Sequence, residues 1–229
     1  MTSLQKWGKS VRTTIPVMAG YLVLGAGFGI LLRTRSYGLG WALAMSVFIY
    51  AGSMQYVAID LLTGGASLLT TAVTTLLVNA RHLFYGISML ERYRAAGKYA
   101  PYLIFSLTDE TYSLVAARED LTGAECFRIS LLDQLYWVLG TALGSLAGAY
   151  LDFNTTGIDF SLTALFLTVF TEQWLETKDH APALIGLGGS IVCRLLFGAD
   201  SFLLPTMGGM LCCLLVLDAR RTKKGGESV

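Results

Sequence analysis

The sequence predicts an all-α integral membrane protein of about seven to eight transmembrane helices. Hydrophobic residues make up 54% of the 229 positions and charged residues only 14%, whereas soluble domains carry about 25% charged residues. The mean hydropathy is +0.57, and the apolar runs reach the roughly 20 residues that a spanning helix needs. The net charge of +1 argues against nucleic acid as a partner, because phosphate binding needs a concentrated basic surface.

Short loops join the apolar segments, so the chain leaves no room for a separate soluble domain. We therefore expect a single transmembrane transporter domain over residues 1–229. The eight apolar segments are Thr14–Leu32, Trp41–Leu62, Ser67–Leu90, Pro101–Ala117, Phe127–Tyr150, Asp159–Trp174, Pro182–Gly198 and Phe202–Leu217.

The loop charges predict that both chain ends face the cytoplasm, because Lys and Arg are enriched in cytoplasmic loops. With eight spans, ten basic residues fall inside: Lys6, Lys9, Arg12, Arg118, Arg128, Lys178, Arg220, Arg221, Lys223 and Lys224. Five fall outside: Arg33, Arg35, Arg92, Arg94 and Lys98. The basic stretch ERYRAAGK conflicts with this bias, so we expect one or more of the marked segments to be re-entrant or broken.

An internal repeat is visible in the sequence. Residues 36–56 resemble residues 155–174, and each stretch follows a glycine-spaced helix, GAGFG at 25–29 and GSLAG at 144–148. The repeat-like halves extend over approximately 13–117 and 127–217. Repeated halves are common in transporters, whose substrate lies at the repeat interface, but chance similarity between apolar stretches is the alternative.

The third apolar segment carries an unusual polar group, VNARHLFYG at 78–86. On a continuous helix, Asn79 and His82 share one narrow face with Thr71, Thr75 and Gly86. Arg81 lies on the neighbouring face, and leucines cover the opposite side. Half of this helix is therefore expected to face protein or water rather than lipid.

The fourth segment contains two consecutive carboxylates, Asp109 and Glu110. A charged residue near the centre of a span costs around 2.5–3.5 kcal/mol on insertion scales. Together with Arg81 these residues must be paired, protonated or hydrated. Two interpretations stay open: an ion pair that only fastens two helices, or a site for a substrate or a proton. Tyr102, Ser106, Asp109 and Ser113 are expected on one helical face.

The remaining polar candidates in the apolar segments are a serine, three glutamines and an aspartate. Gly52 and Ser53 in AGSMQ are expected to break the second segment and free backbone groups for a ligand. Gln55 and its repeat partner Gln173 are candidates for substrate contacts or for hydrogen bonds between helices. Asp133, with Gln134 beside it, is expected near the start of the fifth segment, facing the lipid headgroups.

Several motifs together resemble the AzlC family of branched-chain amino acid permeases. They are GAGFG (25–29), AGSMQ (51–55), NARHLFYG (79–86), LTDETY (107–112) and FTEQW (170–174). The resemblance implies export of valine, leucine and isoleucine, with methionine as a further candidate, across the cytoplasmic (inner) membrane. It also implies a separate small hydrophobic subunit of the AzlD type.

A zwitterion with an aliphatic side chain suits the polar residues. Its carboxylate is expected to pair with Arg81 or with backbone N–H groups at a broken helix near Ser53, and its ammonium with Asp109 or Glu110. The predicted substrate-binding residues are Ser53, Gln55, Asn79, Arg81, Asp109, Glu110, Tyr112 and Gln173. The predicted proton-coupling residues are His82, Asp109 and Glu110, since His titrates near neutrality and burial favours protonated carboxyls.

No cofactor, metal or enzymatic activity is expected. The chain has only two histidines, His82 and His180, which leaves little for a zinc site. The alternatives to a secondary transporter are a passive channel, a structural subunit of a membrane complex, or an intramembrane enzyme that uses His82, Asp109 and Glu110.

Overall fold

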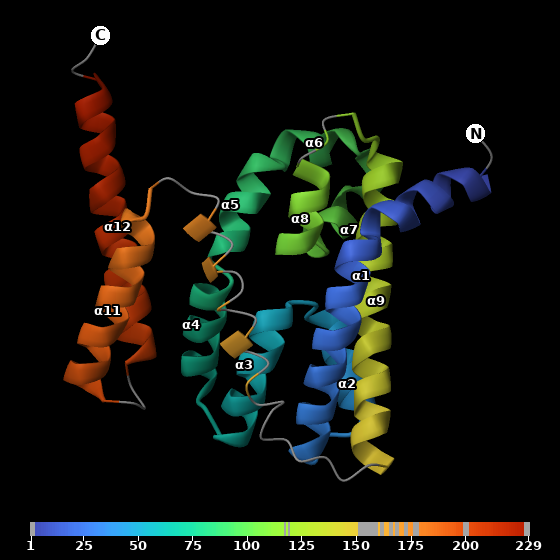
Figure 1. Ribbon diagram of the computed structural model, residues 1–229, viewed down its shortest axis with the longest axis horizontal. Coiled ribbons are helices and arrows are strands. Elements are labelled where there is room, and N and C mark those ends of the chain that lie inside the picture. Colours follow the sequence, from blue (N-terminus) through green and yellow to red (C-terminus); the bar gives the residue numbers. More distant parts are fainter. Residues whose placement is uncertain are drawn as a thin grey trace. The chain divides into compact units, whose positions relative to one another are not determined.

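The computed structural model describes residues 3–116, 118, 120–150, 160, 163–164, 167, 170–171, 174–175, 179–198 and 202–226. Every regular element in this part of the chain is helical, which confirms the predicted all-helical class. Two compact units are present, unit 1 (Met1–Leu162) and unit 2 (Thr163–Val229). The helices of unit 1 are α1 (Ser3–Thr34), α2 (Leu39–Phe48), α3 (Gly52–Thr63), α4 (Leu68–Val78), α5 (Arg81–Ser88), α6 (Leu90–Ala95), η1 (Gly97–Tyr99), α7 (Ala100–Phe105), α8 (Asp109–Ala116) and α9 (Gly123–Tyr150) (Figure 1).

The two longest helices of unit 1, α1 and α9, pack side by side through the two glycine motifs. Gly25 meets the backbone of Gly140, and Gly29 meets that of Gly144, so the two helices run in the same direction. A Cβ atom added to Gly144 would lie 2.0 Å from the carbonyl oxygen of Ala26. Small residues are needed here because only they let two helix backbones approach this closely.

Helices α2 and α3 form a helical hairpin that turns back inside unit 1. The helical conformation is interrupted between them at residues 49–51, where Tyr50 has a φ of 43°. Ala42 near the start of α2 and Ile59 near the end of α3 both join the core that contains Leu31 and Leu32 of α1. Both ends of this hairpin therefore lie at one end of unit 1 (Figure 1). The second segment is interrupted as predicted, but at residues 49–51 rather than at Gly52 and Ser53, which begin α3. The marked segment Trp41–Leu62 therefore does not cross from one end to the other.

The third apolar segment is divided at Asn79 and Ala80 into α4 and α5. Asn79 ends α4, its N–H donating to the carbonyl oxygens of Thr75 and Leu77, and Arg81 begins α5. The expected continuous helix is wrong, and the expected single face joining Thr71, Thr75, Asn79, His82 and Gly86 is wrong with it. Asn79 leaves the helical conformation with a φ of −93° and a ψ of 6°.

Helices α7 and α8 form a second helical hairpin, which enters unit 1 from the end opposite to the first (Figure 1). They are separated at residues 106–108, and Thr108 accepts a hydrogen bond of 3.3 Å from the N–H of Thr111. Leu103 of α7 and Val115 of α8 share one core with Cys126 at the start of α9. The expectation that Tyr102 and Ser106 share a helical face with Asp109 and Ser113 is therefore wrong.

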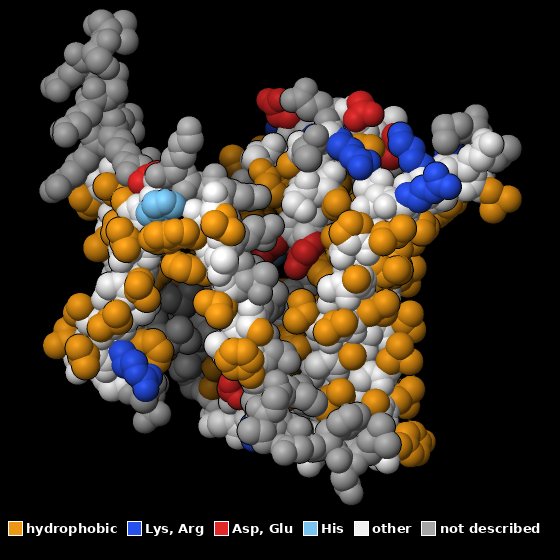
Figure 2. Space-filling model, viewed as in Figure 1, with side chains coloured by type: hydrophobic (Ala, Val, Ile, Leu, Met, Phe, Trp, Pro, Cys, Tyr) orange, Lys and Arg blue, Asp and Glu red, His pale blue; other side chains and the backbone are white. Residues whose placement is uncertain are grey.

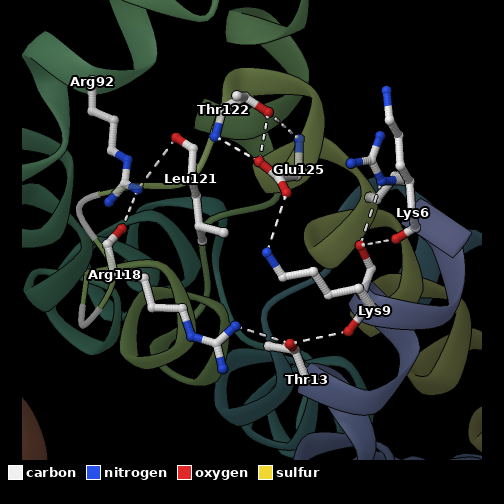
Figure 3. A network of polar contacts seen from close by, with 10 residues as sticks. Lys6, Lys9, Thr13, Arg92, Arg118, Leu121, Thr122 and Glu125 are labelled. Carbon is white, nitrogen blue, oxygen red and sulfur yellow. Dashed lines mark hydrogen bonds and ion pairs between the residues drawn. The ribbon is translucent and has the colours of Figure 1, made fainter. Parts of the chain in front are cut away.

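Basic residues gather at the end of unit 1 where the N-terminus lies (Figure 2). Arg92 donates to the carbonyl oxygen of Val115 at 2.7 Å and also to that of Arg118. Arg118 donates to the hydroxyl of Thr13, and Lys9 pairs with Glu125 at 3.7 Å (Figure 3). The basic stretch ERYRAAGK thus lies at the same end as the basic N-terminus. The stretch no longer conflicts with the expected bias of basic residues. Because the α2–α3 hairpin turns back instead of crossing, ERYRAAGK and the N-terminus lie at the same end.

Only α1, over Leu4–Thr34, is by itself long and apolar enough to span a bilayer among the described residues. The interruptions shorten α2 to α5, α7 and α8, whereas α9 is continuous over 28 residues. The count of seven to eight spans stays a prediction. Unit 2 contains α11 (Ala181–Phe197) and α12 (Leu203–Gly226), which pack against each other where Gly186 and Gly189 meet Met210. The repeat-like halves also stay a prediction, since most of residues 155–174 lie outside the described part of the chain.

Candidate functional site

The three helix breaks of unit 1 line one cavity of about 590 Å³. This volume lies within the roughly 300–1,000 Å³ that is usual for small-molecule sites. Tyr50 and Ala51 come from the first break, Asn79 from the second and Leu107 from the third. Most of the wall is aliphatic or aromatic, formed by Ile49, Leu83, Ile87, Leu90, Ile104, Phe105 and Leu107.

An ion pair joins the second and third breaks. The Arg81 guanidinium lies 2.8 Å from Asp109 Oδ2 and donates to the hydroxyl of Ser53 at 3.0 Å. Arg81 and Asp109 are the first residues of α5 and α8, and Ser53 is the second residue of α3. Three of the eight predicted substrate-binding residues therefore lie in contact, and the interruptions explain how residues from three segments meet.

The ion pair is incompletely satisfied. Arg81 Nε, Asp109 Oδ1 and Asn79 Oδ1 are buried without a hydrogen-bond partner. About a third of the Arg81 side chain (32%) and a quarter of the Asp109 side chain (27%) are exposed. Helix N-termini carry partial positive charge, and orphaned donors and acceptors are costly when buried. This arrangement is suited to a ligand that carries both a carboxylate and an ammonium group.

His82 lies at the cavity, whereas Tyr112 lies beside α5. The His82 ring lines the cavity, and its Nδ1 is 3.2 Å from the carbonyl oxygen of Asn79. Tyr112 stacks on Tyr85 with 4.5 Å between ring centroids and accepts a hydrogen bond of 3.2 Å from Ser88. His82 is therefore placed where a ligand or a proton can reach it, while Tyr112 supports α5 from α8.

Gln55 is buried between the α2–α3 hairpin and α9. Its amide nitrogen donates to Ser46 at 3.3 Å, and Ser46 donates to Thr141 of α9 at 3.1 Å. Its Oε1 has no hydrogen-bond partner, and the residue does not line the cavity. Gln173, its predicted repeat partner, lies outside the described residues.

Glu110 contacts α1, and Asp133 lies deeper in unit 1 than the sequence suggested. Glu110 Oε2 accepts a hydrogen bond of 2.7 Å from the hydroxyl of Tyr21 in α1. Asp133 is completely buried, and its Oδ2 accepts a hydrogen bond of 2.9 Å from Thr111. The expectation that Asp133 faces the headgroups is wrong, because α9 begins at Gly123 rather than near Phe127. At 1.5 Å per residue, Asp133 lies about 15 Å into the helix.

Gln134 is also buried rather than facing headgroups. It accepts a hydrogen bond of 2.7 Å from Tyr102 and donates one of 3.2 Å to the carbonyl oxygen of Val47. It thus links α9 to both hairpins. The signal that could have located Asp133 and Gln134 is the Thr122–Glu125 spacing, which is a helix-start pattern.

Interrupted helices around a largely apolar cavity are typical of helical membrane transport proteins. The chain belongs to the AzlC family, since the family model described as AzlC protein matches residues 16–151. It is 46% identical over 209 residues to the Bacillus subtilis branched-chain amino acid transport protein AzlC, covering 89% of this chain and 82% of that protein.

More distant relatives are also membrane proteins by name. An uncharacterized membrane protein of Helicobacter pylori (strain ATCC 700392 / 26695) is 42% identical over 207 residues, covering 89% of this chain and 91% of that protein. The Escherichia coli inner membrane protein YgaZ is 26% identical over 220 residues, covering 90% and 87%. No solved structure matches this chain.

Proposed function

We propose that this chain is a secondary transporter that exports branched-chain amino acids across the cytoplasmic membrane. Valine, leucine and isoleucine are the proposed substrates, with methionine as a further candidate. Membership of the AzlC family supports membrane transport, and the name of the B. subtilis relative supports the substrate class.

Two observations carry this proposal: the Arg81–Asp109 ion pair and the apolar cavity. The cavity is lined by Asn79 and His82, which are close to Arg81 in the chain, but not by Arg81 or Asp109 themselves. An amino acid zwitterion can insert between the two side chains, its carboxylate facing Arg81 and its ammonium facing Asp109. The internal ion pair of 2.8 Å is then replaced by two ion pairs with the substrate. Because the zwitterion brings no net charge, the net charge of the pair stays at zero, and each charged group of the substrate gains an opposite partner that offsets its desolvation.

The remaining polar groups fit the same pose. The Ser53 hydroxyl, already 3.0 Å from the guanidinium, and the N-terminus of α3 can both face the substrate carboxylate. The unpartnered Oδ1 atoms of Asn79 and Asp109 can accept hydrogen bonds from its ammonium group.

The cavity wall favours an aliphatic side chain. Leu83, Ile87 and Ile104 line it, so a branched hydrocarbon gains burial of about 25 cal/mol per Å² of apolar surface. A substrate with a charged side chain would leave that charge unpaired against the same wall, and this penalty provides discrimination.

Proton coupling and a partner subunit complete the proposal. His82, Asp109 and Glu110 are the proposed coupling groups, because all three lie at or next to the interrupted helices. A small hydrophobic subunit of the AzlD type is proposed to cover part of the exposed apolar surface of the transporter. The proposed location is the inner membrane, crossed several times.

Counterflow of labelled valine in liposomes tests the proposed function. The chain is reconstituted together with its proposed partner, and Arg81→Gln and Asp109→Asn are compared with wild type. Loss of a charged hydrogen bond of about 1.5–3 kcal/mol predicts roughly 10- to 100-fold weaker counterflow. Arg35→Gln and Asp60→Asn, both at exposed positions, are the matched controls and are expected to behave as wild type.

The outcome also separates the transporter from its alternatives. Saturable counterflow that the two site variants abolish supports the proposal. Unsaturable flux that persists in both variants would indicate a channel and contradict it. Wild-type liposomes that move no valine would also contradict it.

A further inference from the structure

A row of hydrogen bonds joins the partly buried carboxyl group of Glu110 to the completely buried one of Asp133. Glu110 Oε2 is 2.7 Å from the hydroxyl of Tyr21, which is 2.7 Å from that of Thr108. Thr108 is 3.1 Å from the hydroxyl of Thr111, which is 2.9 Å from Asp133 Oδ2. Four oxygen-to-oxygen contacts therefore connect α8, α1 and α9 in one continuous chain.

The four contacts of this hydrogen-bonded row need a definite number of hydrogens. Each of the four contacts needs one hydrogen, and the hydroxyls of Tyr21, Thr108 and Thr111 supply three. An ionised carboxylate supplies none, whereas a protonated one supplies one. All four contacts are made only when one further proton is present, either on Glu110 or on Asp133.

The two placements of that proton are related by reversing every hydrogen bond. With the proton on Glu110, the donors run through Tyr21, Thr108 and Thr111 and end on an ionised Asp133. With the proton on Asp133, they run the other way and end on an ionised Glu110. Passing hydrogens along the three hydroxyls converts one arrangement into the other, and the total charge stays at minus one.

The surroundings disfavour two ionised carboxylates. Asp133 and Thr111 are completely buried, and Tyr21 and Thr108 are 4% and 6% exposed. Among the described residues, neither Glu110 nor Asp133 forms an ion pair with Lys or Arg. Asp133 Oδ1 also lacks a hydrogen-bond donor. Two like charges in such a site share a proton more readily than they both ionise.

Other titratable groups face this pair from neighbouring elements. Glu110 is close enough to Asp133 for an electrostatic interaction between the two carboxyls. Both carboxyls are also close enough to interact with Tyr50, which lies between α2 and α3. Tyr102 of α7 is near Asp133, and Asp109 and Arg81 are near Glu110. Glu110 thus lies beside the proposed substrate site, while Asp133 lies at the other end of the row of hydrogen bonds.

We propose that Glu110 and Asp133 hold one shared proton, which moves between them through Tyr21, Thr108 and Thr111 during transport. This proposal rests on the proposed function for its role in coupling. It assigns Asp133 as a proton-binding residue, and it assigns the three hydroxyls as the relay that connects it to the substrate site.

Infrared spectroscopy of the purified protein tests the shared proton without any transport assay. Wild type is expected to show the carbonyl stretch of a protonated carboxylic acid, and both Glu110→Gln and Asp133→Asn are expected to remove or shift it. The exposed control Asp60→Asn is expected to leave it unchanged. Absence of this band in wild type, or its persistence unchanged in both variants, would overturn the proposal.

Valine accumulation in liposomes tests the role in coupling. With Asp133→Asn, accumulation driven by a pH gradient is expected to fall to the level seen without a gradient, while valine counterflow is retained. Wild-type accumulation by this variant would overturn the proposal, and so would accumulation that follows a sodium gradient instead of the pH gradient. If wild type moves no valine, the proposed function fails, and the infrared band still decides whether the proton is shared.

A second variant keeps the proposal testable if Asp133→Asn does not fold. Thr111→Val preserves both carboxyl groups but removes the hydroxyl that joins them. It is expected to shift the infrared band and to slow pH-driven accumulation. An unchanged band together with unchanged accumulation would overturn the proposal.

Discussion

The α2–α3 hairpin and the α7–α8 hairpin share a shape but differ in chemistry. Both turn back inside unit 1 at an interrupted helix, and both bond to α9. The first does so through neutral groups, with Gln55 donating to Ser46 and Ser46 to Thr141. The second carries Asp109 and Glu110 and reaches Asp133 of α9 through Thr111.

We propose that the first hairpin mainly supports the site and that the second takes part in transport. Neutral hydrogen bonds hold a hairpin in place without any change of charge, whereas carboxylates change their hydrogen-bonding capacity when they gain a proton. The α2–α3 hairpin contributes Ser53 and the cavity wall near Tyr50 and Ala51. The α7–α8 hairpin contributes the groups that can exchange a substrate charge or a proton.

The largest expected effect comes from disrupting the packing of α1 against α9, the two helices that both hairpins contact. A Cβ atom at Gly29 would lie 2.2 Å from the carbonyl oxygen of Thr141, and one at Gly144 would lie 2.0 Å from that of Ala26. Gly29→Ala and Gly144→Ala are therefore expected to separate α1 from α9 and to lower the free energy of unfolding by about 3 kcal/mol or more. Thermal unfolding in detergent is the measurement.

Gly20→Ala is the control for this prediction. A Cβ atom at Gly20 meets nothing within 4 Å, so this variant is expected to unfold at the wild-type temperature. Equal stability of all three variants would show that α1 and α9 do not form the close contact described here.

A matched pair of tyrosines distinguishes the two hairpins directly. Tyr56 of α3 donates to the carbonyl oxygen of Leu24 at 2.7 Å, whereas Tyr21 of α1 bonds to Thr108 and Glu110. Each Tyr→Phe change is expected to cost about 1 kcal/mol of stability, the usual net worth of a hydrogen bond. Only Tyr21→Phe is expected to abolish valine accumulation driven by a pH gradient.

The proposed difference between the hairpins is contradicted if Tyr56→Phe and Tyr21→Phe give the same valine accumulation under a pH gradient. Loss of accumulation in both would mean that the α2–α3 hairpin takes part in coupling. Retention in both would mean that the Tyr21 hydroxyl only stabilises the fold.

The smallest expected effect concerns the start of α9, outside the membrane-spanning part. The N–H and hydroxyl of Thr122 donate to Glu125 Oε2 at 3.0 and 2.8 Å, and these hydrogen bonds hold the pKa of Glu125 below its ordinary value. A lowered pKa means that ionised Glu125 stabilises the fold at neutral pH and that this contribution is lost as the pH falls through the lowered value.

Glu125→Gln is therefore expected to lower the free energy of unfolding by about 0.5 kcal/mol at pH 7, at the low end of the range for helix caps. The difference from wild type is expected to vanish in acid. Denaturation at a series of pH values measures it, with Glu91→Gln at an exposed position as the control. A difference that is the same at every pH would contradict this account.

The sequence predicted the helical class, the α2–α3 break and the residues of the ion pair, because glycines and charges inside apolar runs are strong signals. It did not predict the breaks at Asn79 and at Ser106–Thr108. The periodicity of the polar residues fitted continuous helices, and this outweighed the signals for an ending at Asn79 and a start at Thr108, which is followed by two acidic residues.

Asp133 and the relay could not be predicted from helical periodicity. Asp133 bonds to Thr111 of α8, 22 positions earlier in the sequence, and the relay then continues through Thr108 to Tyr21 of α1, 112 positions earlier. Their meeting depends on how the α7–α8 hairpin turns back against α9, and no local pattern in the sequence encodes that turn.

The most direct test of the central claim is whether valine occupies the cavity between the three breaks. In a background whose four native cysteines are replaced, Ile104→Cys in the cavity wall is alkylated with and without valine. The account predicts that valine slows alkylation at this position and leaves Leu69→Cys, exposed on α4, unaffected. Equal alkylation of Ile104→Cys with and without saturating valine would contradict it.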